Sequence, residues 1–424
     1  MRILMIADDL TGALDTGVQF AQNGIDAEVF PFPADRPHGK LKAVIERSRV
    51  STLVVDAASR HLQPHEAASR VSEIVLTVRR AAATRGADRP LLYKKTDSTL
   101  RGNVGAELQA LLTAGDTDVV VFAPAYPRMG RITLDGVQFI DGVPLDCSEF
   151  ANDSRQQMRD ATVADIIARQ TDVATDLLTV RQIRNGDRPS ASPRRIVICD
   201  SETDADLNRI VDWLQDSDFA YSLAGCGGFA SVIASRFRAD LGGGKSSNVS
   251  GARSYRGQEC GYAPSEFEIS TGHGVLLVCG SRHSRSQSQV QFASQKGVLK
   301  PAGDHNGDFQ FIAPPEDLQA DPNAVAERLA EAALVSLRTM QPRVLVAFGG
   351  DTTAAVLRRV GVKSVYPVYE FEPGVVVSRI DADLIPNLKL LVTKAGGFGS
   401  VDVLAKLDEH LYDVVERGMQ CAWQ

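Results

Sequence analysis

The sequence is poor in aromatic residues and cysteines, and it lacks long apolar runs. Aromatic residues make up 6% of the 424 residues and are not interleaved with basic ones, which excludes a stacking platform for single-stranded nucleic acid. None of the six cysteines shares a C-x-x-C spacing, so neither a zinc site nor a disulfide scaffold is indicated. No run of about 18 apolar residues and no signal-peptide pattern is present. We therefore expect a cytoplasmic protein with reduced thiols.

Basic residues are also in the minority, with 46 Lys and Arg against 53 Asp and Glu and a formal net charge of −7. This balance argues against nucleic acid or an anionic membrane as a partner, although it leaves room for a local basic pocket that binds a small anion. The length exceeds one typical domain, and a hydrophobic fraction of 44% can fill two cores. The composition therefore predicts two folded domains.

Short apolar runs alternate with turns of small residues and amphipathic segments, which is typical of βαβ units. We expect two α/β domains with largely parallel sheets. A Gly- and Ser-rich stretch between Leu241 and Glu268 indicates a linker or mobile loop. The predicted parts are a domain over 1–241, a linker over 242–270 and a domain over 271–424. The predicted strands are Arg2–Ala7, Thr52–Asp56, Leu91–Lys95, Val119–Ala123, Arg195–Asp200, Tyr221–Ala224, Gly274–Cys279, Arg343–Phe348 and Leu388–Thr393.

Two aspartates, Asp8 and Asp9, follow the first predicted strand. Ligands of open α/β sheets bind at the carboxyl ends of the strands. Asp9 is placed to cap the next helix, but a cap needs only one acid. Two carboxylates repel phosphate and suit sugar hydroxyls or a hydrated magnesium ion. They also disfavour a dinucleotide fold, which requires G-x-G-x-x-G at this turn.

A second polar cluster follows the predicted strand Leu91–Lys95. Its cations would hold a carboxylate and its aspartate would accept hydrogen bonds from hydroxyls, so the mixture suits an acidic polyol. The alternative is a solvated strand-to-helix loop. Arg60, after the strand Thr52–Asp56, is a further candidate for the carboxylate. The candidates in the cluster are Lys94, Lys95, Thr96, Asp97, Ser98 and Arg101.

Three glycine-containing turns follow predicted strands in the second half of the chain. Glycine lets a ligand approach the backbone, and amide groups at a helix start attract phosphate. There is no G-x-x-x-x-G-K-[ST] motif and no protein-kinase motif set. The turns therefore predict a nucleotide site of another type. Its candidate residues are Ser281, Gly349, Gly350, Asp351, Thr352, Gly396 and Gly397.

These motifs resemble the four-carbon acid sugar kinase family, and DTGVQFA (Asp15–Ala21) is similar to its D-threonate and D-erythronate kinase branch. One departure lies at His283 and Ser286, where the family pattern G-S-x-S-x-x-T-x-x-Q has serine and threonine. The segments that carry the resemblance run across nearly the whole chain. They are Ile6–Ala21, Lys94–Asn103, Pro124–Arg131, Gly349–Leu357 and Thr393–Gly399.

The resemblance implies an N-terminal acid-sugar-binding domain, a C-terminal nucleotide-binding domain and an active site between them. It implies ATP-dependent phosphorylation of the C4 hydroxyl of D-threonate or D-erythronate, with 3-oxo-tetronate as an alternative substrate. Asp9, Arg60 and Lys94–Asp97 match substrate contacts of the family. Residues Ser281, Gly349–Thr352 and Gly396 match its ATP contacts. The partners are then small molecules, and the oligomeric state stays open, with a homodimer among the alternatives.

Phosphoryl transfer requires mainly positioning and neutralisation of charge, so we expect Mg²⁺ to accompany ATP. Asp351 and Asp97 are both candidates for the catalytic base, and no pattern identifies the metal ligands. Two other classes remain open. GGFGSVD near the C-terminus suggests a Rossmann-type NAD(P)-dependent oxidoreductase, although it lies too near the chain end for a full βαβ unit. The other class is a non-catalytic sugar-acid sensor.

Overall fold

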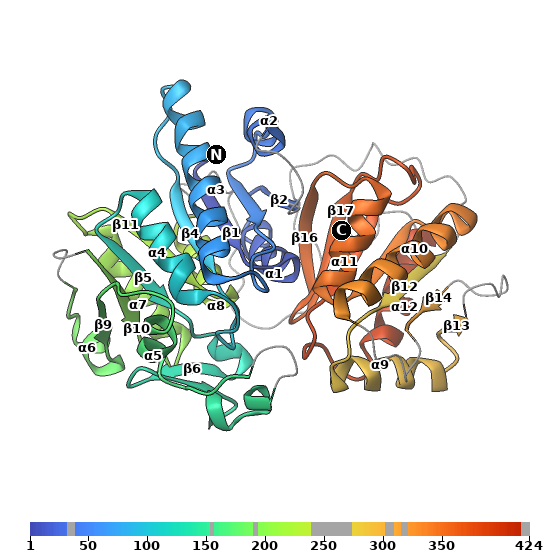
Figure 1. The fold of residues 1–424 in the computed structure, drawn as a ribbon. Coiled ribbons are helices and arrows are strands. Elements are labelled where there is room, and N and C mark those ends of the chain that lie inside the picture. The colour runs from blue at the N-terminus through green and yellow to red at the C-terminus, as the bar shows by residue number, and fades with distance from the viewer. Residues whose placement is uncertain are drawn as a thin grey trace. The chain divides into compact units, whose positions relative to one another are not determined.

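The computed structural model describes residues 1–31, 39–152, 157–189, 194–238, 274–301, 309–314 and 321–416. The chain divides into two compact units, Met1–Gly244 and Lys245–Gln424. The linker predicted over 242–270 lies outside the described residues. Each unit is an α/β structure, which confirms the predicted fold class (Figure 1).

The Met1–Gly244 unit is built on a parallel sheet with the strand order β2-β3-β1-β4-β11-β5-β10-β9 (Figure 1). Its central strands consist largely of buried aliphatic residues, as expected for parallel strands covered on both faces. The strands are β1 (Ile3–Ala7), β2 (Ala27–Pro31), β3 (Thr52–Asp56), β4 (Leu91–Lys95), β5 (Val119–Ala123), β9 (Thr175–Leu178), β10 (Arg195–Cys199) and β11 (Tyr221–Gly225).

Helices cover this sheet in two layers. Helices α1 and α7 both pack on α8 in one layer, and α2, α3, α4 and α5 pack in succession in the other. Among the described residues, none of the helices combines the length and apolarity needed to cross a membrane. The helices are α1 (Leu10–Ala21), α2 (Gly39–Arg47), α3 (Pro64–Thr84), α4 (Val104–Gly115), α5 (Val163–Ala168), α6 (Val180–Asn185), α7 (Asp204–Gln215) and α8 (Gly227–Arg236).

A small antiparallel sheet lies between β5 and α5 in the sequence. Strand β6 (Arg131–Leu134) pairs with β7 (Val137–Ile140), which pairs with β8 (Val143–Pro144). These strands were not predicted, because segments of two to four residues show too little periodicity. Short 3₁₀ helices accompany them: η1 (Pro127–Met129), η2 (Leu145–Cys147) and η3 (Glu149–Asn152).

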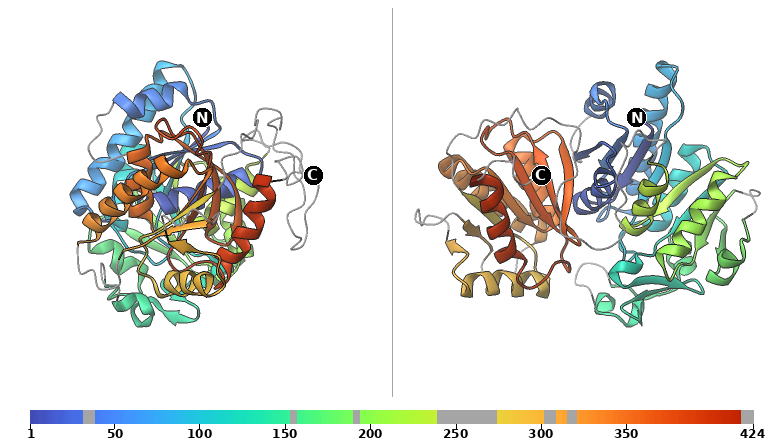
Figure 2. Two further views of the ribbon diagram at one scale, coloured as in Figure 1. Left: turned by 90° about the vertical axis from the view of Figure 1, so that its right-hand side faces the viewer. Right: turned by 180° about the vertical axis from the view of Figure 1, so that it is seen from behind.

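The Lys245–Gln424 unit has the strand order β13-β14-β12-β15-β18-β17-β16, in which β17 runs antiparallel to both of its neighbours. Helices α10 and α11 pack together, and α9 packs with α12 on the other side of the strands (Figure 2). The β16–β17 hairpin was not predicted. The elements are β12 (Val275–Cys279), α9 (Ser284–Gln295), β13 (Lys300–Pro301), β14 (Phe309–Ile312), α10 (Pro322–Met340), β15 (Val344–Phe348), α11 (Gly350–Val360), β16 (Val365–Glu372), β17 (Val375–Ile380), β18 (Leu390–Lys394) and α12 (Val403–Glu416).

The strand register aligns the carboxyl ends that matter for function. Ala7 at the end of β1 pairs with Asp56 of β3 and with Lys95 of β4. In the second unit, Phe348 at the end of β15 pairs with Cys279 of β12 and Lys394 of β18. The segments that follow these strands therefore begin at one edge of each sheet. Strands β3, β4 and β5 also begin and end at the predicted residues.

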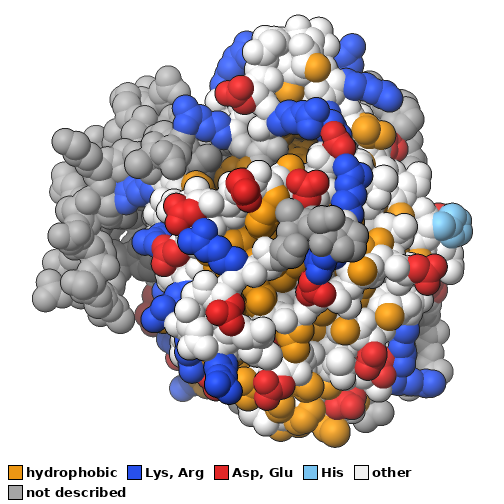
Figure 3. All heavy atoms as spheres, turned by 90° about the vertical axis from the view of Figure 1, so that its left-hand side faces the viewer, with side chains coloured by type: hydrophobic (Ala, Val, Ile, Leu, Met, Phe, Trp, Pro, Cys, Tyr) orange, Lys and Arg blue, Asp and Glu red, His pale blue; other side chains and the backbone are white. Residues whose placement is uncertain are grey.

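Charges of both signs are interspersed on the face drawn in Figure 3, with apolar side chains between them. On the described residues of that face, no broad surface of a single sign is visible. The concentrated charge of the first unit lies instead in its interior, beside the strand ends.

A buried ion pair joins β4 to α4 in the first unit. Lys94 Nζ lies 3.0 Å from Glu107 Oε2, and the side chains are 0% and 2% exposed. Glu107 also accepts a hydrogen bond from the Ser59 hydroxyl, and Lys94 donates to the Lys95 carbonyl at 2.8 Å. Burial raises the pKa of Glu107, and the Lys94 charge opposes this rise. Because an uncompensated buried charge is costly, each partner depends on the other.

Replacing Glu107 with Gln should lower the free energy of unfolding by about 3–5 kcal/mol, because it leaves the Lys94 ammonium buried without a counter-charge. Urea denaturation measures this loss. The double variant Lys94→Met/Glu107→Leu removes both charges and should recover most of it. A double variant no more stable than Glu107→Gln would contradict the ion-pair explanation.

Candidate functional site

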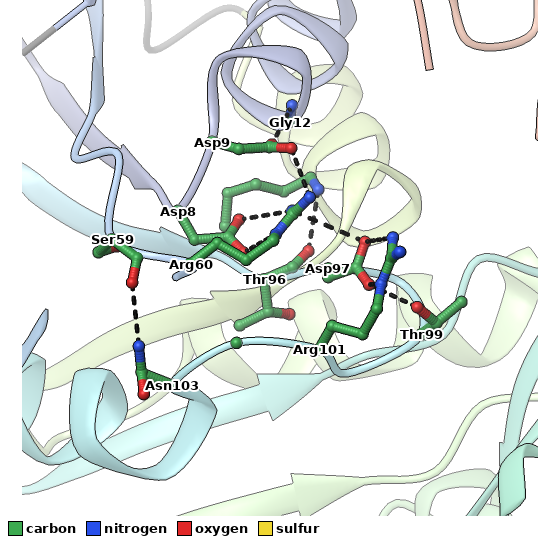
Figure 4. Close-up of polar contacts among 12 residues, drawn as sticks. Asp8, Asp9, Gly12, Ser59, Arg60, Thr96, Asp97, Thr99, Arg101 and Asn103 are labelled. Atoms are coloured by element: carbon green, nitrogen blue, oxygen red, sulfur yellow. Dashed lines mark hydrogen bonds and ion pairs between the residues drawn. The ribbon is translucent and has the colours of Figure 1, made fainter. Parts of the chain in front are cut away.

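Arg60 connects the two aspartates that follow β1 (Figure 4). Its Nε donates to Asp8 Oδ2 at 2.7 Å and its Nη2 donates to Asp8 Oδ1 at 3.1 Å, which is a bidentate pair. Its Nη1 donates to Asp9. The backbone amides of Ser59 and Arg60 also donate to the Asp8 carbonyl, at 2.9 and 3.2 Å. The turn after β3 is thereby anchored to the turn after β1, as the aligned strand ends allow.

Asp9 caps helix α1, as its position in the sequence suggested. Its Oδ1 accepts a hydrogen bond from the Gly12 amide at 2.7 Å. A Cβ on Gly12 would lie 2.8 Å from that oxygen and 3.1 Å from Lys95 Nζ, so glycine is needed for the close approach. Asp9 therefore has two roles, since its second oxygen faces Arg60.

Asp97 lies two residues after β4 and is held by three donor atoms (Figure 4). Arg101 donates to it twice, from Nε at 2.7 Å and from Nη2 at 3.2 Å. Thr99 donates its hydroxyl to the same carboxylate, and Arg60 Nη2 lies 3.7 Å away. Arg60 therefore lies within ion-pair distance of three aspartates, the adjacent Asp8 and Asp9 and the distant Asp97.

The remaining residues of the predicted cluster lie at the same edge, where Thr96 is buried and Ser98 is half-buried. The Thr96 amide donates to Gly225 at 2.8 Å, and its buried hydroxyl has no hydrogen-bond partner among the described residues. The Ser98 carbonyl accepts from Gln138 at 3.1 Å. Asn103, which closes the segment, donates to the Ser59 carbonyl at 2.9 Å. These contacts hold the segment after β4 in one conformation.

Asp15 on α1 is a neighbour that motif reasoning did not select. Its Oδ2 lies 3.9 Å from Lys95 Nζ, which itself donates to the Thr96 carbonyl at 2.9 Å. The Asp15 carboxylate accepts no hydrogen bond from any described residue, and 19% of its side-chain surface is exposed. A Cβ on Gly227 would lie 2.7 Å from Asp15 Oδ2, so glycine leaves room for this carboxylate. Asp15 lies six residues after Asp9, which is not a same-face spacing on a helix, so no local pattern could have identified it.

The acids of the cluster differ in proton affinity. Burial raises the pKa of Asp9 and of Asp15, only partly offset by Arg60 beside the first and Lys95 beside the second. Burial acts in the same direction on Asp8 and Asp97. There the arginines and lysines outweigh it, so the pKa of Asp8 lies below its usual value and that of Asp97 well below. Asp56 forms no ion pair among the described residues, and burial raises its pKa to about 8.

Each of the four predicted cations is already paired with a carboxylate of the chain, so the cluster is not a patch of unbalanced positive charge. Arg60 pairs with Asp8 and Lys94 with Glu107. Arg101 is the most exposed, with 27% of its side-chain surface accessible against 13% for Arg60 and 5% or less for the two lysines. It also lies over the Phe150 ring, 5.6 Å from the centroid.

In the second unit, the three glycine turns follow β12, β15 and β18, which are neighbours in the sheet. A Cβ on Gly280 would collide with Thr352 Oγ1, so the first turn contacts the start of α11 closely. Gly349 has a φ of +103°, which a residue with a side chain rarely adopts. The predicted nucleotide residues therefore gather at one edge of the sheet, with half-buried Asp351 in the first turn of α11.

The two residues that depart from the family pattern, His283 and Ser286, have structural roles. His283 caps α9, and its Nδ1 accepts from the Arg285 amide at 3.1 Å. Ser286 keeps the hydroxyl of the commoner threonine, which donates to the Gly396 carbonyl at 3.1 Å and lies 3.0 Å from Ser281 Oγ, a hydroxyl that can donate to it. The first and third turns are thus joined through one hydroxyl.

The acids of the first unit do not fit a magnesium site, because Arg60 already occupies Asp8 and Asp9. Among the described residues, no three His, Cys, Asp or Glu side chains come together as metal ligands. Magnesium bound with a nucleotide needs only one or two protein carboxylates, since phosphates and water supply the rest. Asp351, the carboxylate within the glycine turns, fits that requirement.

Two family models match the chain. The model of a sugar-binding N-terminal domain matches residues 3–233, and that of a nucleotide-binding C-terminal domain matches residues 303–404. The clusters at the strand ends of the first unit lie within the first match. The turns after β15 and β18 lie within the second match, whereas the turn after β12 precedes it.

Several curated kinases are similar to the chain. A D-threonate kinase of Cupriavidus necator is 30% identical over 94% of this chain and 95% of its own length. A D-threonate kinase of Salmonella typhimurium is 28% identical over 95% of this chain and 97% of its own. A 3-oxo-tetronate kinase of Methylobacterium radiotolerans is 26% identical over 95% and 97%.

Among solved structures, a Haemophilus influenzae protein has a TM-score of 0.64 at 20% identity, covering 96% of this chain and all of its own. This likeness supports the fold. Both domain models and the near full-length similarity to these kinases show that the chain belongs to the four-carbon acid sugar kinase family and is a phosphotransferase.

Proposed function

We propose that the chain transfers the γ-phosphoryl group of ATP to the C4 hydroxyl of D-threonate or D-erythronate. The observation that carries this proposal is the edge of β1, β3 and β4, where carboxylates able to accept from hydroxyls lie beside a partly exposed arginine. A small acidic polyol needs both kinds of group. The relatives named D-threonate kinases support the same substrate class.

In the proposed complex, Arg101 binds the substrate carboxylate. It is the most exposed of the four cations, and Asp97 holds its guanidinium in a defined orientation. Arg60 is saturated by aspartates, so we assign it to positioning Asp8 and Asp9. We assign Lys94 to positioning Glu107, because Lys94 has no exposed surface with which to contact a ligand.

We assign the substrate hydroxyls to the carboxylates of Asp9 and Asp15. An ionised carboxylate only accepts hydrogen bonds, so it favours a hydroxyl over a carbonyl at the same position. Asp15 is the clearer case, because no described residue donates to it. This preference favours the hydroxy acids over a 3-oxo acid, which is the alternative substrate of the family.

For the transfer itself, a base must reach the acceptor hydroxyl, and that hydroxyl belongs to the sugar acid. We therefore assign the acceptor side to Asp97 and the nucleotide side to Asp351. The C4 oxygen bonds to the γ-phosphorus, ADP leaves, and Asp97 receives the hydroxyl proton. Its low pKa is compatible with this role, because a loose transition state needs orientation more than a strong base. Asp351 would hold Mg²⁺, which neutralises phosphate charge when bound.

A coupled assay of ADP release over a panel of four-carbon acids tests the function. D-threonate or D-erythronate should give the highest kcat/KM, ahead of L-threonate and the 3-oxo acids. Phosphorus NMR of the product should show a phosphate ester on C4. A panel without substrate-dependent ADP release would refute the kinase activity, and a 3-oxo acid as the best substrate would refute the substrate assignment.

Asp97→Asn should reduce kcat by about 10²–10⁴-fold while the KM for ATP stays close to its original value. Steady-state kinetics with each substrate varied in turn measures this. Asp351→Asn should instead raise the Mg²⁺ concentration needed for half-maximal rate. Exposed Asp26→Asn serves as the control. If Asp97→Asn keeps near-native kcat, its assignment to the acceptor hydroxyl is wrong.

Asp15→Asn should lower kcat/KM for the preferred acid by about 10–100-fold, because a hydrogen bond to a charged group is lost. The two monodeoxy acids, 3,4-dihydroxybutanoate and 2,4-dihydroxybutanoate, locate the contact. The acid that lacks the contacted hydroxyl should lose little when Asp15 is replaced. Equal losses with both analogues would indicate a general structural effect instead.

A further inference from the structure

Lys394, at the end of β18, is a buried cation in the nucleotide-binding unit. The residue is 1% exposed, and no ion pair to it occurs among the described residues. Burial lowers the pKa of Lys394 to about 7, an effect opposed by the Cys279 sulfur on β12 and reinforced by Arg285 on α9. Strand β15 contributes the uncharged Phe348 ring, whose centroid lies 4.8 Å from Nζ. Burying an ammonium group without a counter-charge is unfavourable, so the hydrogen bonds of Lys394 have to offset the loss of its hydration.

The Lys394 ammonium forms hydrogen bonds with carbonyls of the turn that follows it. Nζ donates to the carbonyls of Gly396 at 2.7 Å, Ala395 at 3.1 Å and Phe398 at 3.4 Å. It also donates to Ser286 Oγ at 2.9 Å, and that hydroxyl donates in turn to the Gly396 carbonyl. The first half of the turn therefore directs its carbonyl oxygens toward one buried point.

Gln289 does the same for the second half of the turn. Its Nε2 donates to the carbonyls of Phe398 at 3.0 Å, Gly399 at 3.1 Å and Ser400 at 2.9 Å. Gln289 lies on α9 and is 0% exposed. Two buried side chains thus hold five carbonyls of the Ala395–Ser400 turn on its inner side.

Inward carbonyls determine where the amides of the same turn point. In a trans peptide the N–H is directed opposite to the C=O, so a carbonyl held inward turns the next residue's amide outward. The amides that follow the Ala395, Gly396 and Phe398 carbonyls belong to Gly396, Gly397 and Gly399. Among the described residues, these three glycine amides donate no hydrogen bond. Successive outward amides form an anion-binding concavity.

We propose that Lys394 is a positioning residue for ATP. With Gln289, it orients the Ala395–Ser400 turn so that the three glycine amides donate to the nucleotide phosphates, and its charge lies directly behind them. The inference rests on the proposed use of ATP, and it adds Lys394, Gln289 and Gly399 to that site. The groups of the turn that meet the nucleotide then belong to its backbone, while the buried side chains set its shape.

Lys394→Met tests the proposal in the full-length protein. The KM for ATP and the Kd of ADP by calorimetry should rise about tenfold or more, since a loss of about 1.4 kcal/mol corresponds to tenfold. The KM for the sugar acid should stay within about twofold, because the turn belongs to the nucleotide-binding unit. Lys389→Met removes a half-exposed lysine just before β18 and is the matched control. An unchanged ADP affinity, or equal rises in both KM values, would overturn the proposal.

Ser286→Ala keeps the test decisive if Lys394→Met does not fold. It removes one acceptor of Lys394 and the hydroxyl bond to Gly396 with a minimal change in volume. ADP affinity should fall about threefold to tenfold, in line with the loss of a neutral hydrogen bond. A folded Ser286→Ala protein with native ADP affinity would also overturn the proposal. Calorimetry needs no sugar acid, so a wild type that binds ADP but phosphorylates no four-carbon acid refutes only the substrate assignment.

Discussion

Pairing of buried charges is the constraint on which the first unit depends. Aspartates, a glutamate, two lysines and two arginines lie where β1, β3 and β4 end, largely out of contact with water. A charge buried alone would cost several kcal/mol, so each cation lies beside a carboxylate. Arg60 meets this requirement for three aspartates at once, and the turn after β3 has to follow the position of Asp8. The local backbone of the site is therefore a consequence of charge neutralisation.

The second unit has the opposite electrostatic character, because its turns offer hydrogen-bond donors where the first unit offers carboxylate acceptors. Its turns contribute backbone donors and contain few carboxylates, and the described hydrogen bonds of Lys394 go to carbonyl and hydroxyl oxygens. An arrangement of this kind suits a ligand that brings its own negative charge, whereas the neutralised cluster of the first unit suits a ligand whose hydroxyls need acceptors. The two units therefore differ in electrostatic design although both are α/β sheets.

Much of the fold and part of the site could be predicted from the sequence. Buried aliphatic runs located nine strands within one or two residues, because parallel strands covered on both faces are continuously apolar, whereas the shorter and edge strands such as β2, β9, β13 and β14 were missed. The motifs also identified the turns after β1, β4, β15 and β18. The ion-pair partners of the site residues could not be predicted. Arg60, for example, is 52 residues from Asp8, and only the register of β1 and β3 brings them together. Asp15, Glu107 and Lys394 were missed for the same reason, since tertiary contacts rather than local patterns give them their roles.

The Ala395–Ser400 turn has a consequence for selectivity between phosphoryl donors. In the arrangement proposed for it, the groups that meet the ligand are main-chain amides that donate to its phosphate oxygens. All nucleoside triphosphates carry the same phosphate chain, so this turn cannot distinguish adenine from guanine. Discrimination between purine bases must come from side chains elsewhere in the nucleotide-binding unit. Exchanging the donor nucleotide by protein engineering would therefore leave this turn unaltered.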